Sequence, residues 1–279
     1  MRTMKKNYKI LYMASAVAFA AFLALAPAES SAPNSSKDVL FQSSAITALQ
    51  QGVFDGSMTY EELASHGDFG IGTFNSLDGE MVELDDQFYQ IKADGSIYAV
   101  NNSMKTPFAI VTDFASDKEM KFYASGDGSA NLTMLQEYLE NQMPSENIFY
   151  AIRVHGLFNY IKTRSVPAQA KPYTTLAEAT ENQSVFEMFN QSGTLVGFWY
   201  PAFANGVNVP GYHFHFLNDE RTAGGHLLDI RLKNASITFD NTLEFFMDLP
   251  KEKEFLMADL SGANQEDLEK AESNPTSAK

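Results

Sequence analysis

The first half of the chain alternates short apolar stretches with glycine and aspartate. Between residues 67 and 100, Asp78-Gly79 and Asp94-Gly95 lie between such stretches. Asp-Gly pairs favour tight hairpin turns, because glycine readily adopts the positive φ that these turns need. We therefore predict that this half is rich in β-structure. The predicted strands cover residues 71–74, 81–84, 88–92 and 96–100, and residues 108–114 form another apolar run.

A helical pattern follows in the middle of the chain. Leu132, Leu135, Leu139 and Met143 recur every three or four residues, and Pro144 comes next. Apolar residues at this spacing share one face of an α-helix, and proline stops it. The pattern predicts an amphipathic helix over residues 132–143. Further helices are predicted at residues 45–53 and 176–189.

Strand patterns return in the second half. Two strands are predicted on either side of Gly156, and a series of turn-separated strands follows. Strands and helices come in blocks and not in strict alternation, which is typical of α+β proteins. We therefore predict an α+β fold with mixed and antiparallel β-sheets, a few packing helices and two sheet-rich halves. The strands of this half are expected at residues 149–154, 158–163, 194–200, 211–217, 226–232, 236–239 and 243–249.

The amino terminus has the order of a secretory signal peptide. A basic segment, residues 1–9, precedes an apolar run over residues 10–26, and small residues follow. Cleavage is expected at Ala28 or Ala32, which makes the mature protein periplasmic or extracellular without a stable membrane anchor. A polar linker over residues 29–40 would come next.

Composition excludes several classes of chemistry. The chain has no cysteine, so disulfides, thiolate metal ligands and cysteine nucleophiles are absent. Its 20 basic and 35 acidic residues give a formal charge of −15. Removal of residues 1–28 takes away four basic residues and leaves 16 against 35, a charge of −19. Such a protein repels phosphate backbones, so nucleic acid is not expected as a partner.

A group of histidines is the strongest candidate for chemistry. In the predicted strand 211–217, the period of two sends His213 and His215 to one face and the aromatic residues to the other. A hairpin with residue 217 opposite 226 would put His226 on the same face, whereas a slip by one residue would not. Three neutral imidazoles with open positions are typical of catalytic zinc. The pattern also suits partly exposed histidines without a ligand, a cupin or a carbonic anhydrase.

Several segments resemble the α-acetolactate decarboxylase family, and they occur in the order found in that family. The resemblance extends from about residue 48 to about residue 272. The segments are 66–74 (HGDFGIGTF), 77–80 (LDGE), 88–90 (FYQ), 106–108 (TPF), 149–153 (FYAIR), 211–216 (GYHFHF) and 224–226 (GGH).

The resemblance implies a set of site residues. The three histidines would bind one zinc ion, Glu80 and Glu272 would reach the metal site, and Arg153 would face the substrate. Glu266 or Glu269 could take the place of Glu272, because the tail has little sequence identity to fix the register. His155 stands where the family suggests an acidic residue. His66 and His155 are expected to be structural or surface residues.

The resemblance also implies a reaction, the conversion of α-acetolactate to (R)-acetoin and carbon dioxide by a homodimer. A metal acting as a Lewis acid could stabilise the enediolate that loss of carbon dioxide leaves. Arg153 would hold the substrate carboxylate, Glu80 would deliver a proton, and Glu272 would complete the metal shell or share the proton transfer. The alternatives are another exported zinc enzyme, such as a hydrolase, and a metal-binding protein without catalysis.

These inferences combine into one expected organisation. The tail is expected to be either a loose segment or a short amphipathic helix that reaches the active site. The expected parts are a signal peptide (1–28), a polar linker (29–40), an N-terminal sheet-rich half (41–165), a C-terminal metal-binding half (166–260) and the tail (261–279).

Overall fold

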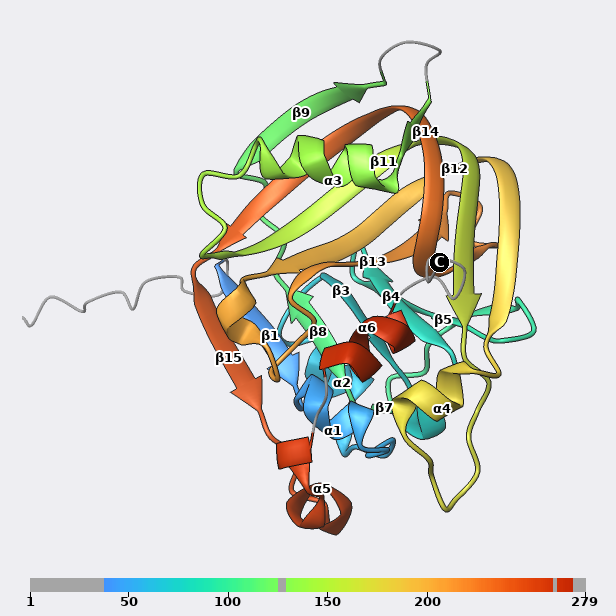
Figure 1. Cartoon of the computed structure of the whole chain (residues 1–279), viewed down its shortest axis with the longest axis vertical. Helices are drawn as coiled ribbons and strands as arrows, with labels where there is room; N and C mark the ends of the chain where they lie inside the picture. Colours follow the sequence, from blue (N-terminus) through green and yellow to red (C-terminus); the bar gives the residue numbers. More distant parts are fainter. Residues whose placement is uncertain (1–37, 125–128, 263–264, 273–279) are drawn as a thin grey trace, which may run out of the picture. The chain divides into compact units, whose positions relative to one another are not determined.

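Two β-sheets face each other in the computed structural model, with an apolar core between them (Figure 1). The structure describes residues 38–124, 129–262 and 265–272, which belong to a unit spanning residues 35–279. The expected signal peptide and most of the expected linker lie outside the described residues. The mixed and antiparallel sheets with few helices confirm the α+β prediction.

The first sheet has seven strands in the order β15-β1-β8-β3-β4-β5-β6. Neighbouring strands are antiparallel except β1 and β15, which run parallel. Because β15 comes late in the chain, this sheet contains more than the N-terminal half. Its strands are β1 (Val39–Ser43), β3 (Phe69–Thr73), β4 (Glu80–Leu84), β5 (Gln87–Ile91), β6 (Ile97–Ala99), β8 (Ala109–Thr112) and β15 (Glu244–Asp248).

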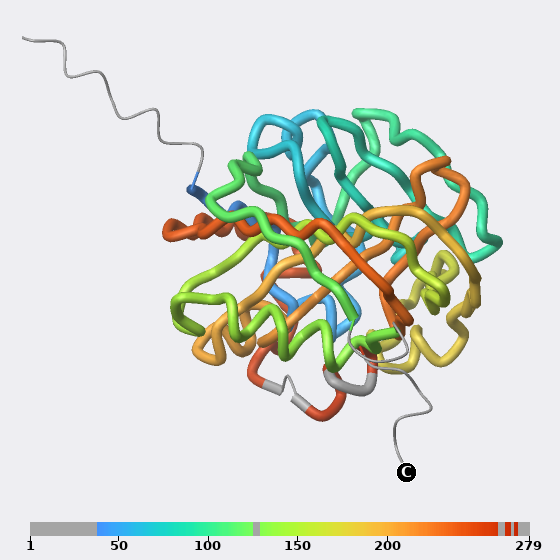
Figure 2. Tube along the Cα trace, turned by 90° about the horizontal axis from the view of Figure 1, so that it is seen from above, coloured from blue at the N-terminus to red at the C-terminus, as the bar shows by residue number. Residues whose placement is uncertain are grey.

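The second sheet is antiparallel and contains the longest strands, β11, β12 and β14. β13 pairs with both β12 and β14, so β11, β12, β13 and β14 form a closed ring of paired strands. A view from above shows the long strands crossing the unit (Figure 2). The strands are β9 (Lys118–Tyr123), β10 (Ala130–Asn131), β11 (Phe149–Ser165), β12 (Ser184–Tyr200), β13 (Gly211–Asn218) and β14 (Gly224–Thr242). A separate small sheet pairs β2 (Met58–Thr59) with β7 (Lys105–Thr106).

The helices are short and cover three different parts of the sheets. α1, α4 and α6 contribute buried residues to the core between the two sheets. α3 packs on the other face of the second sheet, and α2 packs on the other face of the first. The α-helices are α1 (Ile46–Gln50), α2 (Tyr60–Leu63), α3 (Leu132–Glu140), α4 (Leu176–Thr180), α5 (Lys253–Met257) and α6 (Gln265–Glu272). Three 3₁₀ turns cover Asn75–Leu77, Ala202–Ala204 and Leu260–Gly262.

The helix expected over residues 176–189 is wrong beyond its first turns. α4 ends at Thr180, and β12 begins at Ser184. Residues 184–189 alternate between half-buried and exposed positions and pair with the end of β11. Sheet pairing therefore decides the structure of this segment, and the periodicity that suggested a helix does not.

The break predicted at Gly156 is also wrong, because residues 149–165 form one strand, β11. A Cβ atom at this glycine would lie 2.5 Å from the Asn234 carbonyl oxygen of β14. Gly156 therefore permits a close approach of two strands and does not mark a turn. The segments 226–232 and 236–239 likewise belong to one strand, β14. The expected boundary between residues 165 and 166 separates β11 from β12, although these two strands pair along most of their length.

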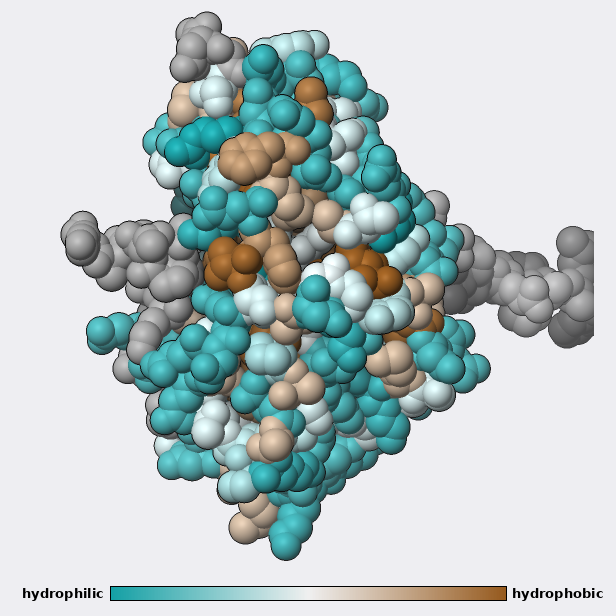
Figure 3. All heavy atoms as spheres, turned by 90° about the vertical axis from the view of Figure 1, so that its right-hand side faces the viewer, coloured by the Kyte–Doolittle hydropathy of each residue, from teal (hydrophilic) through white to brown (hydrophobic). Residues whose placement is uncertain are grey.

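Polar side chains dominate much of the surface shown in Figure 3, with hydrophobic residues concentrated toward its middle. Among the described residues, no helix has the length and apolar character needed to span a bilayer.

Candidate metal centre and active site

Three histidines converge at the point where β13 pairs with β14. Along β13, His213 and His215 face the core between the sheets, whereas Phe214 and Phe216 belong to the apolar cluster on the other face. His226 comes from β14. The three side chains are 7%, 1% and 4% exposed, and their candidate ligand nitrogens lie within 4.8 Å of one another. The shared face predicted from the strand period is confirmed.

The register of the hairpin differs from the expected one by two residues. Leu217 lies opposite Gly224, and His215 lies opposite His226. An even shift leaves every side chain on its face, which is why His226 still meets the other two histidines.

A bulge in β14 adds an arginine to this group. Arg164 pairs with His226 and Thr163 pairs with Leu227, but the next paired position on β14 skips Leu228. A bulge changes which residues of the two strands share a face. The cross-strand pair places Arg164 beside His226 in the pocket that contains all three histidines.

Burial favours the neutral form of the three histidine rings, and a backbone hydrogen bond orients one of them, His215. His215 Nδ1 lies 2.7 Å from the Met81 carbonyl oxygen, so Nδ1–H donates there and the Nε2 lone pair is left for a ligand. His213 Nε2 and His226 Nδ1 are 3.2 Å apart. Burial, together with the positive charge of Arg164, lowers the pKa of His213 to about 3. Burial also lowers the pKa values of His215 and His226 well below 6.5.

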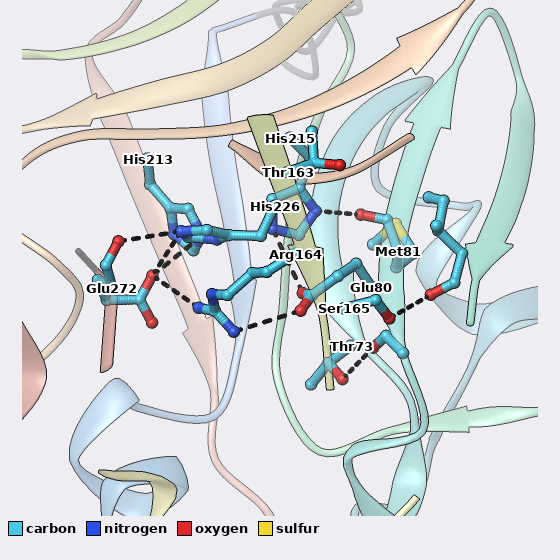
Figure 4. Close-up of polar contacts among 12 residues, drawn as sticks. Thr73, Glu80, Met81, Thr163, Arg164, Ser165, His213, His215, His226 and Glu272 are labelled. Atoms are coloured by element: carbon cyan, nitrogen blue, oxygen red, sulfur yellow. Dashed lines mark hydrogen bonds and ion pairs between the residues drawn. The ribbon is translucent and has the colours of Figure 1, made fainter. Parts of the chain in front are cut away.

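Two carboxylates from distant segments of the chain, β4 and α6, approach the imidazoles (Figure 4). Glu80, the first residue of β4, has Oε2 3.6 Å from His215 Nε2. Glu272, the last residue of α6, has Oε2 3.5 Å from the Nε2 atoms of both His213 and His226. That buried oxygen has no hydrogen-bond partner among the described residues. Neutral imidazole nitrogens that converge with a buried carboxylate oxygen lacking a hydrogen-bond partner fit a divalent cation such as zinc.

Arg164 lies between the two carboxylates. Its Nη1 is 3.4 Å from Glu80 Oε1, its Nη2 is 3.7 Å from Glu272 Oε2, and the residue is only 3% exposed. Burial raises the pKa of Glu80 to about 7, against the lowering effect of Arg164, and the charge of Glu272 adds to the rise. Burial raises the pKa of Glu272 as well. At neutral pH Glu80 can therefore carry an exchangeable proton beside the positive charge of Arg164.

Comparison with known proteins identifies the family. A family model described as alpha-acetolactate decarboxylase matches residues 40–262. The chain belongs to the α-acetolactate decarboxylase family. It is 51% identical to the alpha-acetolactate decarboxylase of Methanosarcina mazei over 239 residues, which cover 86% of this chain and 82% of that protein. The Klebsiella aerogenes protein of the same name is 41% identical, with 81% and 85% covered.

Solved structures of the family have the same fold. The crystal structure of alpha-acetolactate decarboxylase from Bacillus subtilis superimposes with a TM-score of 0.82 at 38% sequence identity, and the match covers 85% of this chain and all of that one. The resemblance inferred from the sequence motifs is therefore confirmed. The protein is an enzyme of the acetolactate decarboxylase class, a carboxy-lyase that acts on a small molecule.

The structure does not bring Arg153 to the candidate site of this decarboxylase. Arg153 pairs with Asp85 and lines a separate open cleft. It precedes Arg164 by eleven residues on the same strand, roughly 35 Å at the usual rise per residue. The arginine of the pocket is Arg164, which corrects the expectation. The sequence signal for Arg164 is a charged residue directly after the predicted strand 158–163, but the segment that resembles the family ends at residue 153.

The other two histidines lie outside the metal group. His66 stacks on the Phe41 ring with a centroid distance of 3.7 Å. His155 is exposed and lies 3.2 Å from Asp219. Both placements agree with the structural or surface roles that were predicted for them.

The loop before β4 fixes the position of Glu80. Gly79 has φ +90°, and its N–H donates to the Val166 carbonyl oxygen at 3.0 Å. Thr73 Oγ1 donates to the Gly79 carbonyl oxygen at 2.7 Å. These bonds hold Gly79, the residue before Glu80, from β3 and from the residue that directly follows β11. Apart from Gly72 and Thr73, the rest of the pocket wall is apolar and includes Ile46, Leu49, Leu77, Phe108, Val166 and Leu176.

Proposed function

We propose that the protein converts α-acetolactate to (R)-acetoin and carbon dioxide, with zinc bound by His213, His215 and His226. The observation that carries the proposal is one buried pocket that combines three neutral imidazoles, Arg164 and two glutamates. The pocket has one polar side and one apolar side, and so does the substrate, which carries a carboxylate, a hydroxyl and a ketone next to two methyl groups. Family membership supports the reaction.

Arg164 binds the substrate carboxylate, the role that the sequence suggested for Arg153. A zinc ion bound at the imidazoles would supply Lewis acidity toward the keto and hydroxyl oxygens. The guanidinium can donate two parallel hydrogen bonds to a carboxylate, which fixes its orientation. A fixed carboxylate keeps the breaking carbon–carbon bond perpendicular to the ketone plane, so that its electron pair can pass into the carbonyl group.

Glu80 supplies the proton that completes the reaction. Its pKa of about 7 leaves a proton on a large fraction of the molecules at neutral pH. After carbon dioxide leaves, Glu80 donates this proton to the carbon that carried the carboxylate, and solvent later restores it. Delivery from a single side of the pocket sets the hand of acetoin. Glu272 faces His213 and His226 and helps to hold Arg164.

The test measures zinc content and acetoin formation on the same purified sample. We expect acetoin from α-acetolactate with zinc bound, no acetoin above the blank after chelation, and recovery when zinc is returned. Chiral chromatography should show excess (R)-acetoin. A zinc-loaded, folded protein that forms no acetoin would refute the function, and full activity in the chelated protein would refute the metal role.

Export and dimer formation are further parts of the proposal. The basic, apolar and small-residue order of residues 1–28 supports export to the periplasm or the medium. Intact mass of the protein recovered outside the cytoplasm should correspond to a chain starting after Ala28 or Ala32. Family resemblance supports a homodimer, which light scattering on the purified protein would test.

A further inference from the structure

Helix α6 contributes both apolar and polar groups to the metal pocket. Leu268 and Ala271 are 2% and 1% exposed and belong to the core between the sheets. They lie three residues apart, on the same side of the helix. One residue later, Glu272 lies among the imidazoles, and its own carbonyl oxygen is 3.2 Å from His226 Nε2. The helix therefore places a carboxylate and a backbone oxygen at the metal group.

Among the side chains of α6 that the structure describes, the buried apolar ones are Leu268 and Ala271. It has eight residues, and a helix this short is not stable by itself in water. Burial of one leucine and one alanine cannot offset the loss of backbone freedom of eight residues. Among the described contacts, the packing of α6 on α4 and the contacts of Glu272 with His213, His226 and Arg164 also help to hold the helix in place.

We propose that Leu268 is a positioning residue for Glu272, and that docking of α6 and metal binding stabilise each other. The inference rests on the metal site of the proposed function. Leu268 belongs to the core between the sheets and is not among the residues that line the histidine pocket, yet it holds the helix that delivers Glu272. A metal ion bound by Glu272 Oε2, which has no hydrogen-bond partner among the described residues, would in turn hold α6 in place. Such coupling is reciprocal, so each event strengthens the other by the same factor.

Zinc affinity tests the first half of the inference. In competition with a chromophoric chelator, Leu268→Ala should bind zinc about 10- to 100-fold more weakly than the wild type, the range typical of residues that support metal ligands. Leu268→Met keeps the apolar volume and should restore the affinity. Asp267→Ala is the matched control, because Asp267 lies on the exposed side of α6. This control should bind zinc as the wild type does.

Hydrogen exchange of the wild type tests the second half. Zinc should slow amide exchange in residues 265–272. The factor should be similar to the factor by which Leu268→Ala weakens zinc binding. Helix α3 is the internal control, and its amides should exchange equally with and without zinc. Equal exchange of α6 in both states would overturn the inference, even if Leu268→Ala failed to fold. Zinc affinity of a folded Leu268→Ala within about twofold of the wild type would overturn it as well. A wild type that binds no zinc would instead refute the metal site itself.

Discussion

Replacement of Arg164 by methionine tests the central assignment of the site. Methionine is similar in length but has neither charge nor hydrogen-bond donors. The substrate carboxylate would lose a bidentate charge-assisted contact worth about 3 kcal/mol, so kcat/KM should fall by about 150-fold or more. The pKa of Glu80 should rise above about 7, because Arg164 is the cation that lowers it.

The free energy of unfolding of Arg164→Met should fall less than is usual when a buried ion pair loses one partner. Breaking such a pair costs about 3–5 kcal/mol when an unpaired charge is left behind. Here the raised pKa values of Glu80 and Glu272 allow both carboxylates to take up protons instead. We expect a loss near the lower end of that range, measured by thermal or chemical unfolding. Zinc should remain bound, because all three imidazoles are intact.

Arg153→Met is the matched control. Its side chain is 31% exposed and pairs with Asp85 away from the pocket. Exposed pairs of this kind contribute little, so kcat/KM should stay within about threefold of the wild type. Zinc-loaded Arg164→Met with kcat/KM close to the wild type would refute the assignment. An equal loss in both variants would show that position 164 has no special role.

Three further changes probe the physical basis of the site and the fold. Burial keeps the histidines neutral, and the pKa of His213 is lowered to about 3. The zinc content after dialysis at about pH 5.5 should therefore equal the zinc content at about pH 7.5. A loss of zinc centred near pH 6.5, roughly the pKa of a free histidine, would contradict this expectation. Burial raises the pKa of Glu83 from 4.5 to about 10, so the folded protein keeps a proton that the unfolded chain loses. The stability of the wild type relative to Glu83→Gln should therefore fall between about pH 5 and pH 8, by up to about 1.4 kcal/mol per pH unit, whereas parallel pH profiles would contradict the burial effect. Gly156→Ala should cost about 1–3 kcal/mol in unfolding experiments, because the added methyl group would press against the Asn234 carbonyl oxygen; an unchanged melting temperature would mean that β14 can move away.

Local periodicity was sufficient for the elements whose residues determine their own neighbours. The alternation in residues 212–216 placed His213 and His215 on one face, and the spacing of Leu135 and Leu139 identified α3. Long-range pairing was not visible in the same way. Residues 184–189 form a strand because β11 offers them a partner, and Gly156 lies within a strand because β14 passes close to it.

The choice of arginine failed for a related reason. Strand alternation can be followed only as far as the strand is regular, and the pairing of β11 with β14 shifts at several points. Leu228 is the extra residue next to the metal group, and no local sequence feature marked it as a bulge. Sequence reasoning therefore found the histidines of one hairpin but could not tell which arginine of the neighbouring strand would lie beside them.

The charge distribution explains how so acidic a protein can accept an anionic substrate. The chain carries a formal charge of −15, which repels α-acetolactate at long range. Within the pocket, Arg164 and a divalent ion would contribute three positive charges against two from Glu80 and Glu272. Protonation of Glu80, favoured by its pKa of about 7, adds one more unit to that excess. Binding is therefore governed by buried groups that salt screens weakly, so moderate salt should change KM less than the net charge of the chain suggests.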